Sequence, residues 1–246
     1  MARLIQHLIE EPRPCSYLSD RCASLEHRIL VDATAAETEA MLIRGWRRFG
    51  PDYFRPLCSP CNECVPVRVP VAGFVPSRSQ RRALRNVGGL RAIIGSPNMD
   101  DARLRLYHRW HAFRESAREW APAKLDKEAY FFSFAFPHPC AREIAYYDDS
   151  VPGAPRLVGV GLCDETETAW SAVYFYYDPD YAGLSPGVAN VLFQIELARS
   201  RGLSHVYLGY YVAGSRSMGY KTRFQPYERL VGWPEPHEEP RWTAEP

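Results

Sequence analysis

The amino-acid sequence predicts an α+β fold, in which a small N-terminal α+β module precedes a larger domain built on a mixed or antiparallel sheet. Residues 1–95 form short, irregular segments rich in cysteine, proline and arginine. A long amphipathic helix, three strand-like runs and a second helix follow them. We therefore expect domains at 1–95 and 96–233, and a flexible tail rich in proline and glutamate at 234–246.

The elements of the first half follow from local patterns. We expect a helix near residues 35–46, then a segment rich in cysteine and proline, then a strand at 65–71. The clearest helix lies at 100–120, where apolar residues recur every three to four positions, the spacing of one helix face. These residues are Leu106, Trp110, Phe113 and Ala117.

The second half alternates strands with one more helix. Residues 141–147, 156–163 and 168–177 are rich in β-branched and aromatic side chains, and turn residues separate them, as in an antiparallel meander. A helix then begins at Ser185 as N-cap with Pro186 in its first turn, and Gly202 ends it. Its apolar stripe comprises Val188, Val191, Leu192 and Ile195. With the strand at 205–208, this order of elements is that of N-acetyltransferase-like domains.

Composition narrows the class of protein. With 246 residues and 46% hydrophobic content, the chain can bury a substantial core and is not disordered. Its first residues lack the apolar core of a signal peptide or membrane anchor, so we expect a cytoplasmic protein without a membrane partner. The seven cysteines are then expected to be reduced thiols or metal ligands, not disulfides.

A basic segment interrupts an otherwise near-neutral sequence. Residues 64–99 contain no Asp or Glu, whereas the net charge of the whole chain is only +1. The arginines of this segment are Arg68, Arg78, Arg81, Arg82, Arg85 and Arg91. If 77–85 is helical, several of them share one side near the helix N-terminus, which favours binding of phosphate or carboxylate. The alternative is a solvated amphipathic helix without a ligand.

Three cysteines stand at two-residue gaps, at Cys58, Cys61 and Cys64. This spacing lets thiolates in a turn reach one metal ion, and Cys15 or Cys22 would supply a fourth ligand for zinc or an iron–sulfur cluster. The alternative is that small thiols fill a cramped, proline-rich module.

The segment 208–228 combines glycines, tyrosines and cations, and it follows an apparent buried strand. Ligands in α/β folds are met at the carboxyl ends of strands. We therefore expect a site here, where phenols and a hydroxyl relay protons and a cation stabilises an oxyanion. The candidate catalytic residues are Tyr210, Ser215 and Lys221, with Tyr177 and Asp178 from the end of the strand at 168–177.

Several common catalytic and nucleotide-binding motifs do not occur. His108 and His111 are spaced at i and i+3 and do not form the His-Glu-x-x-His pattern of zinc proteases. The sequence has no Gly-x-Ser-x-Gly elbow, Walker loop or Rossmann glycine run. The turn at 183–187 lacks the paired glycines of a pyrophosphate cradle and is expected mainly to cap the following helix.

Six segments between Pro14 and Leu230 carry a family resemblance. They are Pro14-Cys-Ser-Tyr-Leu18, Tyr53-Phe-Arg-Pro56, Cys61-x-x-Cys64 with Val65-Pro-Val-Arg68, Ser77-Arg-Ser-Gln-Arg-Arg82, Tyr176-Tyr-Asp-Pro179, and Gly209-Tyr-Tyr211 through Met218-Gly-Tyr-Lys-Thr-Arg-Phe-x-Pro226. The chain resembles the bacterial aspartate/glutamate leucyltransferases, relatives of the eukaryotic arginyl-tRNA-protein transferases. The resemblance implies an N-acetyltransferase-like C-terminal domain. It also implies transfer of an aminoacyl group from charged tRNA to proteins with N-terminal Asp or Glu, which marks them for N-degron proteolysis.

For the reaction, the resemblance implies that no cofactor is required, because an aminoacyl ester is already activated toward an amine. The compact bacterial form favours leucine as the donor amino acid, with arginine as the alternative. Substrate contacts are expected from Arg78, Arg81, Arg82, Tyr220 and Arg223. Cys15-Ser-Tyr-Leu18 departs from the Cys-x-x-Cys of eukaryotic relatives, which puts their implied iron–sulfur cluster in doubt here.

Two other classes of function compete with this interpretation. A CoA-dependent N-acetyltransferase would explain the C-terminal domain, but it requires a glycine-rich pyrophosphate loop that 183–187 supplies only in part. A metal-dependent RNA-binding module would explain the cysteines and arginines, but it leaves the 208–228 segment without a purpose.

Overall fold

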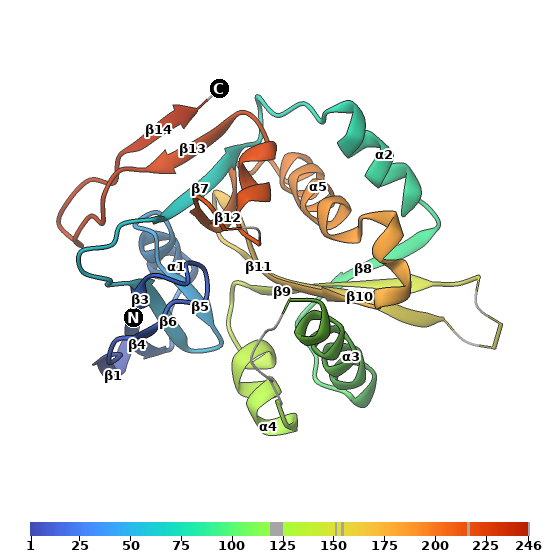
Figure 1. The fold of residues 1–246 in the computed structure, drawn as a ribbon, viewed down its shortest axis with the longest axis horizontal. Helices are drawn as coiled ribbons and strands as arrows, with labels where there is room; N and C mark the ends of the chain where they lie inside the picture. The colour runs from blue at the N-terminus through green and yellow to red at the C-terminus, as the bar shows by residue number, and fades with distance from the viewer. Residues whose placement is uncertain (119–124, 151, 154, 216, 246) are drawn as a thin grey trace.

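The computed structural model describes residues 1–118, 125–150, 152–153, 155–215 and 217–245. A small antiparallel sheet lies beside a large mixed sheet (Figure 1). The small sheet has the order β1 (Arg3–Ile9), β4 (Leu25–Val31), β6 (Asp52–Pro56) and β5 (Arg47–Phe49). A short pair, β2 (Arg13–Pro14) and β3 (Cys22–Ala23), accompanies it.

Helix α1 (Ala35–Leu42) connects the two sheets. It begins at a capping box, in which the Thr34 hydroxyl accepts from the Glu37 amide and the Glu37 carboxylate accepts from the Thr34 amide. Met41 packs against Trp46 and Tyr53 of the small core. At the other end of the helix, Leu42 packs with residues of the large sheet. The helix expected at 35–46 therefore ends earlier, because the chain must turn before β5.

The large sheet contains a meander followed by a parallel strand. Strands β8 (Leu90–Gly95), β9 (Ala141–Asp148), β10 (Arg156–Glu165) and β11 (Ala169–Tyr177) pair antiparallel in sequence order. Helix α5 (Pro186–Ser200) then leads to β12 (His205–Val212), which pairs parallel to β11. This is the N-acetyltransferase-like order that the sequence predicts. Three further strands, β7 (Cys64–Pro70), β13 (Tyr227–Leu230) and β14 (Trp242–Glu245), extend the sheet beyond β12.

Helices cover both faces of the large sheet (Figure 1). Helices α5 and α2 (Arg78–Asn86) lie on one face, where Trp170, Ile195 and Phe224 belong to the main core. Helices α3 (Asp101–Arg118) and α4 (Lys127–Tyr130) lie on the other face, over a second core that includes Trp110 and Tyr176. Three shorter helical segments are η1 (Phe131–Ala135), η2 (Pro179–Leu184) and η3 (Gly219–Arg223).

Four expectations differ from the structure or extend beyond it. The Ser185 hydroxyl makes no capping hydrogen bond, because this residue takes the left-handed conformation (φ 62°) between η2 and α5. The tail expected to be flexible contains β14, in which the Trp242 indole donates to the Ile43 carbonyl at 3.1 Å. In the predicted helix 100–120, residues 119–120 and the side chain of Ala117 lie outside the described part. Strands from both sides of the expected boundary at residue 95 share the large sheet.

Candidate functional site

The pairing of β11 with β12 ends part-way along the two strands, and we call the region beyond the last pair the wedge. The two strands pair only from Ala169 to Ser171 on one side and from His205 to Tyr207 on the other. Beyond these pairs, Arg47 of β5 enters from the small sheet. Its Nη1 donates to Ser171 Oγ at 2.7 Å, and its Nη2 donates to the Ala172 carbonyl. The Arg47 guanidinium therefore takes the place of the next backbone hydrogen bonds between β11 and β12.

Lys221 reaches the same wedge from η3. Its Nζ donates to the carbonyl oxygen of Tyr210 at 2.6 Å, and only 6% of the residue is exposed. Gly209 adopts a φ of +77°, and a Cβ added there would lie 3.6 Å from Lys221 Nζ and 3.5 Å from Arg47 Nε. The two cationic groups thus face one point beside the backbone of β12.

The surroundings of Lys221 favour its neutral form. Burial, reinforced by the charge of Arg47, lowers the pKa of Lys221 from 10.5 to about 7, and Cys64 opposes this effect. Burial also lowers the pKa of Arg47. Within the described ranges, no acidic side chain pairs with either cation. A lysine with a pKa near 7 can act as a base at neutral pH.

Tyr210, a predicted catalytic residue, contributes its backbone to the wedge. Its hydroxyl donates to the carbonyls of Gly45 at 2.9 Å and Phe54 at 3.3 Å, which ties β12 to the small sheet. Burial raises the pKa of Tyr210 far above its usual value. The buried phenol therefore acts as a link between sheets in this structure, while its carbonyl orients Lys221.

Two other predicted residues of the tract, Ser215 and Tyr220, differ in exposure. Ser215 is buried in the turn after β12, with its Oγ 3.2 Å from Ser217 Oγ. Tyr220, next to Lys221 in η3, is 38% exposed, yet burial by its neighbours raises its pKa.

The structure does not bring Tyr177 and Asp178 to Lys221. The Tyr177 ring lies 4.1 Å from the ring of Trp110 of α3, between centroids. The buried Asp178 carboxylate pairs with Arg109 at 3.1 Å and with Arg156. The sequence-based expectation assumed that the ends of β11 and β12 lie together, but the strands stop pairing at Ser171.

The predicted basic helix forms and lies beside η3. In α2, the Ser77 hydroxyl and the Gln80 side chain form a capping box, and Gln80 Nε2 also donates to the Arg223 carbonyl at 2.9 Å. All four α2 arginines and Arg223 are exposed. The α2 arginines are Arg78, Arg81, Arg82 and Arg85. An exposed basic surface therefore begins next to the segment that carries Lys221.

The four cysteines predicted as metal ligands lie in one region but do not form a ligand cage. Burial and the proximity of Cys58, Cys15 and Cys61 raise the pKa of Cys64 to about 12. Cys58 Sγ lies 3.4 Å from the Ser24 backbone. In the described part of the chain, no three His, Cys, Asp or Glu side chains are placed to hold a metal ion.

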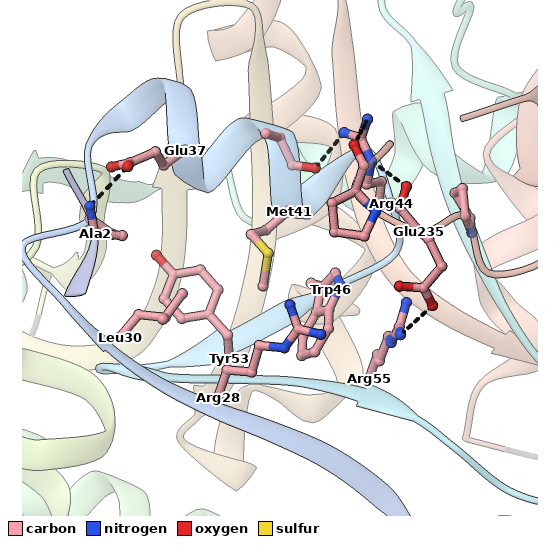
Figure 2. A pocket seen from close by; sticks show the side chains of 14 residues that line it. Ala2, Arg28, Leu30, Glu37, Met41, Arg44, Trp46, Tyr53, Arg55 and Glu235 are labelled. Carbon is pink, nitrogen blue, oxygen red and sulfur yellow. Dashed lines mark hydrogen bonds and ion pairs between the residues drawn. The ribbon is translucent and has the colours of Figure 1, made fainter. Parts of the chain in front are cut away.

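A separate cavity of about 260 Å³ lies between α1, the small sheet and residues 234–236 (Figure 2). Trp46 and Met41 contribute to its wall, and none of the predicted site residues lines it. Its arginines are already neutralised or bonded, since Arg55 pairs with Glu235 at 3.0 Å and Arg44 donates to backbone carbonyls. Arg44 is thus hydrogen-bonded, but its charge has no acidic partner in the described ranges.

Sequence reasoning missed Arg47 as a member of the site. Two arginines are adjacent at 47 and 48, and side chains alternate across a strand. Arg48 is buried and pairs with Asp164, whereas Arg47 enters the wedge. The alternation of side chains along a strand predicts that Arg47 and Arg48 point to opposite faces. It does not identify the partners of Arg47, which lie more than 120 residues away in the sequence. No local pattern identifies them.

The family models and the curated relatives that match this chain agree on one family. Residues 13–82 match the model described as arginine-tRNA-protein transferase, N terminus, and residues 102–231 match its C terminus counterpart. The aspartate/glutamate leucyltransferase of Helicobacter hepaticus is 34% identical, with 98% of each chain covered. That of Stenotrophomonas maltophilia is 37% identical over 89% of this chain and 87% of its own. Among solved structures, FemX matches with a TM-score of 0.49 and 8% identity, covering 82% of this chain and 68% of its own.

Proposed function

This chain belongs to the arginine-tRNA-protein transferase family, and on that basis we propose that it transfers leucine from Leu-tRNA to the N-terminal Asp or Glu of acceptor proteins. The product carries a destabilising N-terminus for the N-degron pathway. Relatives that match over nearly the whole chain are named aspartate/glutamate leucyltransferases, which supports leucine over arginine as the donor. The structural observation that carries the proposal is the buried Lys221, which has no acidic partner among the described residues and lies beside Arg47 in the wedge.

The chemistry needs a deprotonated amine close to an activated ester. The α-amine of an acceptor has a pKa of about 8, so a base with a pKa near 7 is well matched to it. The amine nitrogen attacks the carbonyl carbon of the leucyl ester, and the C–N bond of the new amide forms. Neutral Lys221 takes the proton that this nitrogen loses. The ester C–O bond then breaks, and the ribose oxygen of the tRNA leaves with the proton returned by Lys221.

The geometry suits Lys221 for this role. A neutral amine can still donate one N–H to the Tyr210 carbonyl, and that hydrogen bond fixes the direction of its lone pair. The positive charge of Arg47 helps to lower the pKa of Lys221, and it stabilises the negative charge that develops on the ester oxygen. Positioning and charge stabilisation are therefore sufficient without a covalent enzyme intermediate.

The tRNA is placed on the exposed arginines. Arg78, Arg81 and Arg82 of α2 lie beside Arg223 of η3, through the hydrogen bond from Gln80 to the Arg223 carbonyl. Phosphate contacts of this kind position a nucleic acid without reading its bases. In this arrangement the tRNA body approaches over α2, and its charged end enters the wedge beside Tyr220.

Cofactors and location remain predictions. We propose that the transfer requires no cofactor, and that Cys15, Cys58, Cys61 and Cys64 are the residues that would hold zinc or an iron–sulfur cluster if one binds. No step above depends on such a group. Across the described residues, the helices are too short or too polar to cross a bilayer. A cytoplasmic location is proposed because charged tRNA is supplied there.

The test is transfer of radiolabelled leucine, and separately arginine, from charged tRNA to otherwise identical peptides that begin with Asp, Glu, Ala or Lys. We expect leucine to enter only the Asp and Glu peptides. Arginine in place of leucine would identify the arginyl branch. If neither label is transferred, the proposed function is wrong, and an assay with acetyl-CoA would test the N-acetyltransferase alternative.

A further inference from the structure

We propose that Arg47 binds the side-chain carboxylate of the acceptor's N-terminal Asp or Glu and thereby selects which N-termini receive leucine. The inference rests on the proposed function, because it assumes an acidic acceptor in the wedge between β11 and β12. It adds a specificity role for Arg47 to the effect that its charge has on the pKa of Lys221.

The first argument is an unneutralised charge. Arg47 is partly buried, yet it has no acidic partner in the described ranges. Neighbouring arginines differ, since Arg48 pairs with Asp164 and Arg55 pairs with Glu26 at 2.7 Å. Removing a guanidinium from water without a counter-ion is unfavourable. A ligand anion would supply the missing charge.

The second argument is the arrangement of donors. A guanidinium carries five N–H groups, and the bonds to Ser171 and Ala172 use two of them. These two bonds hold the group in place. Arg47 Nε lies 3.5 Å from the Cβ position of Gly209, on the side of the wedge that also holds Lys221 Nζ. A fixed, planar group with donors to spare is suited to bind a carboxylate through two hydrogen bonds.

The third argument is the closeness of Arg47 to the proposed base. Arg47 Nε and Lys221 Nζ lie 3.5 and 3.6 Å from one point. An N-terminal Asp or Glu carries its α-amine and its carboxylate on the same residue, so an amine at Lys221 places the carboxylate near Arg47. Phosphates of tRNA recur along a polymer, and exposed arginines such as Arg82 are better placed to meet them. The carboxylate is therefore the anion that fits Arg47.

The test measures binding without chemistry. Fluorescent peptides that begin with Asp, Glu, Asn or Gln are titrated with the wild-type protein, Arg47→Gln and Arg47→Lys. We expect the wild type to prefer the acids over the amides. Arg47→Gln should lose roughly 10- to 100-fold in affinity for the acids, with little change for the amides. Arg47→Lys, which keeps the charge but not the planar fork, should lie between them. Arg241→Gln, at an exposed position, is the matched control.

Each result has a defined meaning. An unchanged preference in Arg47→Gln would overturn the inference. An equal loss for acids and amides, with a lower melting temperature, would show a merely structural role and would also overturn it. A raised KM for Leu-tRNA with an unchanged acid preference would assign Arg47 to the donor. If the wild type binds acidic peptides selectively, Arg47→Gln loses that selectivity and nothing is transferred, then the carboxylate site at Arg47 stands and the proposed function fails.

Discussion

Lys221 and Tyr210 are joined by a hydrogen bond of 2.6 Å between the lysine Nζ and the tyrosine backbone carbonyl. The hydroxyl of the same tyrosine donates to the backbone of Gly45, in the segment that leads into β5. Tyr210 therefore orients the proposed base and anchors the small sheet, which supplies Arg47. The site depends on both sheets being held in one relative position.

Replacing Lys221 with Met should reduce transfer by about 100-fold or more, because general base catalysis contributes that much. The fold should remain intact, since an apolar side chain of similar length fills the same space without a charge to desolvate. Steady-state transfer and thermal unfolding test this together. Lys127→Met, at a lysine that is 61% exposed, is the matched control and should change neither. Full activity in Lys221→Met would remove this lysine from the mechanism.

The pH dependence should follow the neutral form of Lys221. Because its pKa is lowered from 10.5 to about 7, the neutral base becomes populated above about pH 7, and initial transfer rates should rise from pH 6 to 8. Arg47→Gln should move this rise to higher pH, since Arg47 lowers the lysine pKa. If the pH profile of the transfer rate is the same in Arg47→Gln as in the wild type, Lys221 is not the group that sets it.

The same shift in pKa predicts a change in stability. Between about pH 7 and 10.5 the unfolded chain holds a proton on Lys221 that the folded protein has lost. Stability should therefore rise with pH across this window, and Lys221→Met should lack that contribution. Urea unfolding at several pH values compares the two proteins. Parallel curves for wild type and variant would argue against a buried, neutral lysine.

The basic helix should contribute salt-dependent affinity for tRNA. Substituting Arg81 and Arg82 with Gln removes two exposed charges without disturbing the capping box at Ser77. The slope of log affinity against log salt should fall by up to about 2. Filter binding of Leu-tRNA at several salt concentrations measures the slope, with Arg241→Gln as control. A loss of affinity that does not vary with salt would point to packing of α2 instead.

Asp178 should prove structural and not catalytic. Its carboxylate is 3% exposed and pairs with Arg109 and Arg156, so Asp178→Asn should destabilise the protein by about 2 kcal/mol or more. Asp180→Asn, at a carboxylate that is 60% exposed, should cost less than about 0.5 kcal/mol. Chemical denaturation measures both. Loss of transfer in Asp178→Asn at unchanged stability would restore the catalytic role.

The last strand should stabilise the large sheet. Trp242→Ala removes the hydrogen bond to the Ile43 carbonyl and the ring contact with Tyr207. It also removes the ring whose centroid lies 4.3 Å from Arg68 Cζ. We expect a loss of about 2 kcal/mol, because the residue is only partly buried. Thr243→Ala, exposed in the same strand, is the control. Equal stability of the two variants would mean that β14 adds little.

Local sequence patterns were sufficient for most elements of the large sheet. The spacing of apolar residues predicts α3 and α5, and the β-branched runs predict β9, β10 and β11. These elements follow periods of 3.6 and 2 residues, which neighbouring positions alone determine. By contrast, β14 is not predicted, because its stability comes from Ile43 and Arg68, which are distant in sequence.

By itself, the sequence determined the family, the order of helices and strands and the importance of the segment that carries Lys221. Only the tertiary structure decided which side chains share the site. Arg47 enters because β5 lies against the wedge, whereas Asp178 pairs with Arg109 and Arg156 beyond the point where β11 and β12 stop pairing. The pKa of Lys221 likewise depends on its burial and on Arg47, not on its neighbours in the chain. Charge and desolvation depend on which groups are close in space, and a sequence motif gives only the identity and order of its own residues.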